Sequence, residues 1–282
     1  MTSKVTSKVT SKVTSIVNMN PINRESVRVS HRRTMGLLAG LALVSTACGT
    51  KDAEGPLSPT GAQGRVRFVN VITDPTRGVV NAILEGLPFG VNLSYTQSTP
   101  ATLAAPNTAL YSAILAGSRT LVLKRTADTN VTVLSAPFTV TESQDRTLYA
   151  IGGTANSAVT AFSTVDDNTT PTVGQTRLRV VHLSPTAGAV DIFITAPGAD
   201  LAAATATFGN VAYQTASLYS SVVAGTYQVR VVPTGTAPTA RTGAVSINVA
   251  SLSLPAGTGR TIVAADNNVG GAPLRAFVLN DR

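Results

Sequence analysis

The chain has 282 residues, of which 43% are hydrophobic, 5% are aromatic and none is tryptophan. Its formal charge of +8 is unevenly placed, because residues 1–47 hold seven of the 22 Lys and Arg residues and one of the 14 Asp and Glu residues. The rest of the chain is close to neutral and has no basic stripe, which argues against nucleic-acid binding. Its richness in Thr, Val, Ser and Ala favours strands and predicts an all-β protein.

Residues 1–47 have the pattern of a leader that contains a signal peptide. Four arginines precede an apolar run at 35–44, and the small residues Ser45-Thr46-Ala47 follow it. This order is typical of export, and the run is too short to span a bilayer; a buried core helix is the alternative. A repeated Thr-Ser-Lys-Val tract stands before the signal, so Met19 competes with Met1 as the start. The pair Arg32-Arg33 leaves the twin-arginine route open.

Cys48 follows this signal and is the only cysteine of the chain. It cannot form an internal disulfide, and an exported protein normally avoids a free thiol. The stretch Val44–Gly49 resembles a bacterial lipobox, in which the cysteine is diacylated and becomes the mature N-terminus, although Ser45 stands where the motif prefers Leu. We therefore predict lipidation at Cys48, with ordinary cleavage near Ala47 as the alternative. Two acyl chains would give a stable anchor.

A Gly- and Pro-rich tether is expected at 48–63, and the rest of the chain contains an internal repeat of two copies. The phrase Arg65–Asn70 returns as Arg177–His182, and Leu110–Gly117 returns as Leu218–Gly225. Repetition on this scale indicates tandem domains. We predict a first module at 64–165, a polar linker at 166–175 and a second module at 176–282.

Both copies show short strand patterns separated by turn residues. Val190, Ile192 and Ile194 fall on one face of a strand, and Tyr227, Val229 and Val231 alternate in the same way. Many short strands with Gly and Pro turns predict two tandem immunoglobulin-like β-sandwich modules. Strands are expected at 65–72, 79–84, 120–124, 131–134, 138–141, 147–151, 158–162, 177–183, 190–195, 227–231, 244–249, 261–265 and 275–280.

Three phrases of the second copy, Arg177–Pro185, Ala189–Phe193 and Val223–Val229, resemble domain of unknown function 4397 (DUF4397). The first copy resembles it more loosely, with Asn81 where the second has Asp191. The resemblance implies a β-sandwich module of the bacterial cell envelope, often in tandem and often on lipoproteins. It implies no enzymatic activity.

His182 is the one histidine of the two modules, and Ser184 and Asp191 are the nearest groups that could complete a nucleophilic site. A structural role is the alternative, because Asn70 takes the place of His182 in the first copy. No His and Cys cluster suited to zinc appears, and neither does a phosphate-binding loop. The sequence thus predicts no catalytic residue, no cofactor and no metal.

Two further features are compatible with ligand binding, but a structural role is expected for each. Asp166-Asp167-Asn168 offers oxygen atoms to calcium, yet it lacks the spaced carboxylates of a calcium loop and is expected to be a solvated linker. Tyr111 and Tyr219 are a matched pair that is expected to pack in the core or at a corner, with ligand contact as the alternative.

Together these features predict a non-enzymatic, lipid-anchored protein of the cell envelope whose modules serve adhesion, scaffolding or ligand binding. Gly49 is not the Asp that retains enteric lipoproteins at the inner membrane, which favours the outer membrane or cell surface and leaves the periplasmic side open. Expected partners are the membrane and an envelope protein or polysaccharide. The rival hypothesis is an envelope hydrolase or carbohydrate-active enzyme with a site between the modules.

The link between the modules is expected to be mechanical, with residues 62–165 and 176–282 folding independently. A continuous sheet is the competing arrangement, in which the strand at 158–162 completes the other module.

Overall fold

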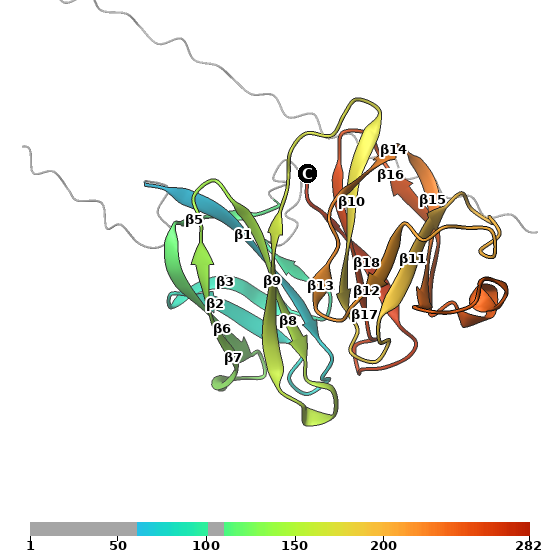
Figure 1. The fold of residues 1–282 in the computed structure, drawn as a ribbon. Coiled ribbons are helices and arrows are strands. Elements are labelled where there is room, and N and C mark those ends of the chain that lie inside the picture. The colour runs from blue at the N-terminus through green and yellow to red at the C-terminus, as the bar shows by residue number, and fades with distance from the viewer. Residues whose placement is uncertain (1–60, 101–109) are drawn as a thin grey trace, which may run out of the picture. The chain divides into compact units, whose positions relative to one another are not determined.

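The computed structural model describes residues 61–100 and 110–282 (Figure 1). The predicted signal peptide, Cys48 and most of the tether lie outside the described residues. The described residues belong to one compact unit that contains both modules. Among the helices of the described part, none combines the length and apolar character needed to cross a membrane.

Module 1 consists of two sheets. The first sheet contains β1 (Gln63–Ile72), β4 (Ser98–Thr99), β5 (Ser112–Leu115), β8 (Asp145–Gly152) and β9 (Val159–Asp166). The second contains β2 (Val80–Leu84), β3 (Leu87–Leu93), β6 (Gly117–Arg125) and β7 (Asp128–Val140). In the first sheet β1 pairs antiparallel with β4 and β5 along one side and parallel with β8 along the other. A short 3-10 helix, Thr154–Asn156, joins β8 to β9.

Module 2 repeats this plan. Its first sheet contains β10 (Gln175–Leu183), β13 (Thr215–Ala216), β14 (Ser220–Val223), β17 (Gly259–Ala265) and β18 (Arg275–Asn280). Its second sheet contains β11 (Val190–Thr195), β12 (Phe208–Val211), β15 (Gly225–Pro233) and β16 (Ile247–Leu254), with a 3-10 helix at Pro238–Ala244. Strands β10 and β17 run parallel, as β1 and β8 do. Each sheet takes its strands from one module, so the continuous sheet considered above is wrong.

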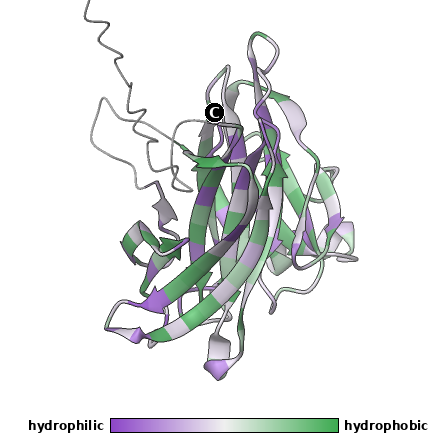
Figure 2. Ribbon diagram, turned by 90° about the vertical axis from the view of Figure 1, so that its left-hand side faces the viewer, coloured by the Kyte–Doolittle hydropathy of each residue, from purple (hydrophilic) through white to green (hydrophobic). Residues whose placement is uncertain are grey.

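Each module has its own apolar core between its two sheets. Side chains alternate along the strands, so that Val190 and Ile192 of β11 are fully buried while Asp191 between them is not. Figure 2 shows the resulting alternation of green and purple bands along the strands. The cores are filled largely by β-branched and aliphatic side chains, as the composition predicts.

A third apolar cluster joins the two modules, and we call it the seam. Because both faces of β1 and β10 are covered, nearly every residue of these strands is buried. One face packs on the core of the same module and the other packs across the seam. The buried seam residues are Val69, Val71, Tyr149, Ile151, Val181, Leu183, Val263, Ala265 and Leu279. The modules are therefore joined by a packed interface, and the prediction of a merely mechanical link is wrong; independent folding stays a prediction.

Most expected strands are present, with two differences. The segments 131–134 and 138–141 belong to the single strand β7, and Val140 is its last residue. The expected strand at 244–249 begins later, at Ile247, because the 3-10 helix continues to Ala244. The sequence patterns did not reveal β3, β4, β5, β12, β13 or β14.

Candidate functional site

The His182 side chain is fully buried on β10 and is held by backbone groups. Its Nε2 lies 2.6 Å from the carbonyl oxygen of Gly188, and its Nδ1 accepts the N–H of Ser184 at 3.4 Å. An Nδ1 that accepts leaves the proton on Nε2, which donates to Gly188. Both ring nitrogens are thereby engaged within the module.

Asn70 makes the two equivalent contacts in module 1, and its Nδ2 also donates to the carbonyl oxygen of Leu93 at 2.8 Å. Its Nδ2 donates to the carbonyl oxygen of Gly78 at 2.7 Å, and its Oδ1 accepts the N–H of Ile72 at 3.1 Å. In both copies the side chain thus accepts the N–H two residues ahead and donates to the glycine of the following turn. This equivalence gives His182 the same turn-holding role as Asn70.

Ser184 and Asp191 do not complete a catalytic group with His182. Ser184 Oγ donates to Oδ1 of Asp266, which also accepts the hydroxyl of Thr186. Asp191 Oδ1 accepts the N–H of Asn210 at 2.8 Å, so its carboxylate holds the neighbouring strand β12. The three groups therefore serve separate local contacts.

The expectation that Asp166-Asp167-Asn168 forms a solvated linker is wrong for its first residue. Asp166 is buried and pairs with Arg179, whereas Asp167 is exposed and pairs with Arg177 at 2.5 Å. The Arg177 guanidinium holds the pKa of Asp167 well below its usual range. Across residues 61–100 and 110–282, no three or more His, Cys, Asp or Glu side chains group in a way that could hold a metal ion.

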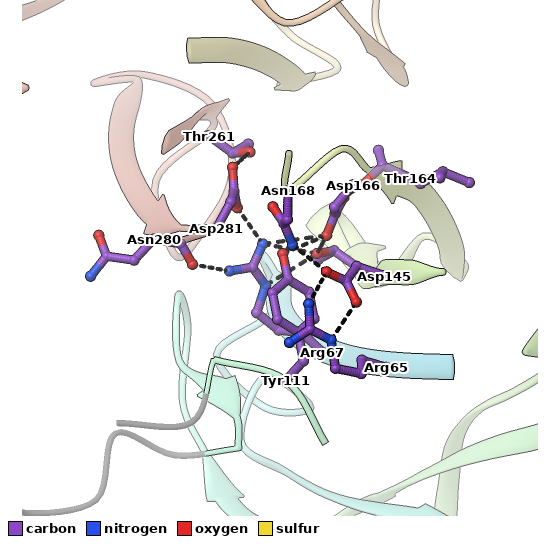
Figure 3. A network of polar contacts seen from close by, with 12 residues as sticks. Arg65, Arg67, Tyr111, Asp145, Thr164, Asp166, Asn168, Thr261, Asn280 and Asp281 are labelled. Carbon is purple, nitrogen blue, oxygen red and sulfur yellow. Dashed lines mark hydrogen bonds and ion pairs between the residues drawn. The ribbon is translucent and has the colours of Figure 1, made fainter. Parts of the chain in front are cut away.

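A buried polar cluster lies at one end of the seam (Figure 3). Arg67 of β1 donates through Nη2 to Asp281 Oδ1 and through Nη1 to the carbonyl oxygen of Asn280, each at 2.7 Å. Its Nε donates to Thr147 Oγ1 at 3.1 Å, and its Cζ lies 4.6 Å from the ring centroid of Tyr111. Burial alone would lower the pKa of Arg67, but Tyr111 and Asp281 raise it. The guanidinium therefore stays charged and bridges to module 2.

Arg179 of β10 makes the equivalent contacts from module 2 to module 1. It donates through Nη2 to Asp166 and through Nη1 to the carbonyl oxygen of Val165 at 2.9 Å. Its Nε donates to Thr261 Oγ1 at 2.8 Å, and its Cζ lies 4.7 Å from the ring centroid of Tyr219. We call Arg67–Asp281 and Arg179–Asp166 the crossed ion pairs, because each arginine reaches the aspartate of the other module.

Each aspartate of the crossed ion pairs also accepts a phenol of its own module. Tyr111 donates to Asp166 Oδ2 at 2.8 Å, and Tyr219 donates to Asp281 Oδ2 at 3.0 Å. Burial, the largest cause, raises the pKa of both phenols, so they remain donors. The matched tyrosines therefore support the carboxylates that hold the two modules together.

The two halves of the cluster correspond residue by residue. Such an interface, in which a residue of one copy contacts its partner and the equivalent contact runs in reverse, is isologous. The apolar seam follows the same rule, since Val69 and Val71 occupy the places of Val181 and Leu183. The corresponding polar residues are Arg67 and Arg179, Tyr111 and Tyr219, Thr147 and Thr261, and Asp166 and Asp281.

Two open grooves flank the crossed ion pairs. One, of about 710 Å³, is lined almost entirely by polar and charged residues, among them Glu142 and the pair Arg65–Asp145, whose charged atoms lie 2.5 Å apart. The other, of about 730 Å³, lies between β9 and the β13 edge and is lined in part by Val165 and Leu218. Leu218 is 89% exposed, so this groove presents apolar surface to solvent.

Comparisons with known proteins give a family but no activity. A search of curated proteins finds no match. Among solved structures the chain matches a leucine-rich repeat protein from Bacteroides thetaiotaomicron at 15% identity and a TM-score of 0.17, over 73% of this chain and 26% of that one, and a likeness this low carries no argument. The family model described as "Domain of unknown function (DUF4397)" matches residues 64–193 and 194–282, with the boundary inside β11. The chain thus belongs to the DUF4397 family and carries two of its domains in tandem.

Proposed function

We propose that this protein is a non-enzymatic, lipid-anchored component of the bacterial cell envelope, in which two immunoglobulin-like β-sandwich modules act as one scaffold for adhesion or ligand binding. The observation that carries the proposal is the seam. Its four buried charged side chains and nine buried apolar residues join the modules, so neighbouring binding surfaces keep a fixed spacing. Fixed spacing suits a display or scaffolding role.

The use made of the polar side chains supports a non-enzymatic role. His182, Ser184 and Asp191 hold turns and strands of their own module, and the crossed ion pairs hold the seam. A hydrolase at the seam would need a nucleophile, a base and an orienting group brought together there. The groups that could supply such chemistry are engaged in structural contacts.

The N-terminal sequence supports an envelope location. A basic stretch, a short apolar run and small residues precede Cys48, which supplies the acylation site of the proposed anchor. Gly49 after the cysteine favours the outer membrane or the cell surface. The tether at 48–63 would then hold the modules away from the bilayer.

The two grooves are the surfaces proposed for an envelope partner. The polar groove beside Arg65 and Glu142 suits hydroxyl-rich polysaccharide, whereas the groove beside Val165 and Leu218 suits an extended protein segment. The second groove is lined by residues of both modules, so a segment bound there could contact both.

The test of the anchor is fractionation of cells that carry the full chain or Cys48→Ser, after labelling with palmitate. We expect the unchanged chain to be labelled and to sediment with membranes, and the variant to be unlabelled and released. Thr50→Ser, a conservative change just beyond the lipobox, is the control and should behave as the unchanged chain does. Equal labelling of the chain and Cys48→Ser would overturn the anchor.

The test of the non-enzymatic role uses the protein released by that variant. We expect it to co-sediment with envelope polysaccharide or to retain an envelope protein while both stay chemically intact. Bond cleavage that tracks with the purified protein and is lost in His182→Asn would overturn the proposal in favour of the hydrolase.

A further inference from the structure

The seam is built from equivalent residues of the two modules. In each crossed ion pair an arginine of the first strand meets an aspartate at the end of the last strand of the other module: Asp166 is the final residue of β9, and Asp281 comes directly after β18. In the apolar part, β1 and β8 of module 1 face β10 and β17 of module 2. The seam face of module 1 is therefore complementary to the seam face of module 2 in any copy of the chain.

The connection between the modules is short and mostly exposed, with Pro171 as its one buried residue. Strand β9 ends at Asp166 and β10 begins at Gln175, so eight residues join them. The ion pair of this segment, Asp167–Arg177, has side chains that are 49% and 16% exposed, and Val173 is 99% exposed. Exposed pairs contribute about 0–1 kcal/mol, so breaking Asp167–Arg177 costs little. The further contacts of the linker are those of Asn168, whose Nδ2 donates to Asp145 and whose carbonyl oxygen accepts from Arg282. The seam itself depends on the module faces and not on the linker.

We propose that the seam also serves as an interaction surface between chains, with module 1 of one chain docking on module 2 of a second copy in a reciprocally exchanged dimer. Every seam contact of the single chain is kept in that dimer, and only the path of the linker changes. The linker gives the partner module an effective concentration on the order of millimolar, which favours the monomer in dilute solution. A high local concentration of chains favours the exchanged dimer. The inference stands on the seam alone and does not depend on the lipid anchor.

Charge exchange between chains tests the proposal. One chain carries Arg67→Asp and the other carries Asp281→Arg, each in the full two-module body with a different affinity tag. Either chain alone places like charges together across its seam. In the exchanged heterodimer Asp at 67 meets Arg at 281, and the other seam keeps the native Arg67–Asp281 pair.

We expect the two chains to co-purify as a one-to-one heterodimer after refolding together, with a melting temperature above that of either alone. The matched control is one chain with both changes, which restores opposite charges within itself and should remain a monomer. If the control folds and the two single variants never co-purify, the proposal is overturned.

A second variant keeps the test decisive if charge reversal prevents folding. Deletion of residues 168–173 leaves Asp167 and Gly174 to join β9 to β10, with a reach of about 10 Å. A hinge this short strains closure of the seam within one chain and therefore favours exchange between chains.

We expect this chain, with every seam residue unchanged, to have twice the monomer mass by light scattering and a cooperative melt. A linker lengthened by six Gly and Ser residues is the control and should give monomers. A shortened chain that stays monomeric would overturn the proposal.

Discussion

Arg67 and Asp281 stand 214 positions apart in the chain, yet Nη2 of the arginine donates to Oδ1 of the aspartate at 2.7 Å. Their side chains are 3% and 0% exposed, so this ion pair joins the modules in the absence of surrounding solvent. Removing one member of a buried pair leaves an uncompensated charge. Removing either the arginine or the aspartate of such a pair is therefore expected to lower the stability of the protein.

Asp281→Ala is predicted to lower the free energy of unfolding by about 3–5 kcal/mol. The buried Arg67 would lose its partner at 2.7 Å and keep only Asp166 at 3.6 Å, a carboxylate that Arg179 already shares. Urea denaturation followed by circular dichroism measures this change. The control is Asp128→Ala, which removes a partly exposed pair with Arg125 at 3.6 Å and should cost about 1 kcal/mol or less. Equal losses in the two variants would contradict the importance of the crossed ion pairs.

His182→Asn is predicted to change the free energy of unfolding by less than about 1 kcal/mol, since Asn70 makes the equivalent contacts in module 1. His182→Leu leaves the Ser184 N–H and the Gly188 carbonyl without their side-chain partner and should cost about 2 kcal/mol or more. Thermal unfolding of both variants distinguishes them. A similar loss for Asn and Leu would refute the turn-holding role.

Gly270→Ala is predicted to destabilise the protein more than Gly271→Ala does. Both glycines have positive φ, at 89° and 73°, so both variants carry backbone strain. A Cβ at Gly270 would lie 2.3 Å from Cγ2 of Thr154 in module 1, whereas a Cβ at Gly271 meets nothing within 4 Å. The difference in melting temperature therefore measures the clash at the contact between modules. Thr154→Gly in the Gly270→Ala background should recover part of the loss.

Asp74 is predicted to stabilise the protein above pH 4 and to lose this effect as the pH falls towards 2. Burial alone would raise the pKa of Asp74, but hydrogen bonds from Thr76 and Arg77 outweigh it and lower the pKa to about 2. A folded-state pKa below the unfolded value means that protons bind more readily to the unfolded chain, so acid favours unfolding.

The measurement is the unfolding free energy of the chain and of Asp74→Asn between pH 2 and 7. The two should differ by about 2 kcal/mol near neutral pH and converge near pH 2. A gap that stays constant over this range would contradict the assignment.

The strand patterns could be predicted from sequence where one face is apolar and the other polar. That condition holds for β11, with Val190 and Ile192 inside, and for the central part of β15. It fails for β3, in which most residues are exposed or half-buried, and for β5 and β14, which have only four residues each. Strands this short or this exposed lack the alternation on which the prediction depends.

The seam was harder to predict than the strands because its polar residues look like surface residues. Arg67 and Arg179 lie in repeated Arg-Val-Arg and Arg-Leu-Arg phrases, and a charge within a strand usually marks the solvent side. One sequence feature did point to burial: alternate residues of a strand share a face, so Arg67 lies on the same face of β1 as Val69 and Val71. Asp281 follows β18 and has no repeated phrase around it, so only the structure shows which carboxylate Arg67 meets.

The parallel pairing of β1 with β8, together with the Arg67–Asp281 contact, has a consequence for the order of folding. Strand β1 can pair early with β4 and β5, but its parallel partner β8 is about 80 residues further along, and the carboxylate that Arg67 meets in module 2 is 214 residues away. Contacts this distant in sequence slow the search for the native state. During synthesis the seam face of β1 would stay exposed until the chain has been made as far as β18. In this interval a second chain or a chaperone has the best access to that face.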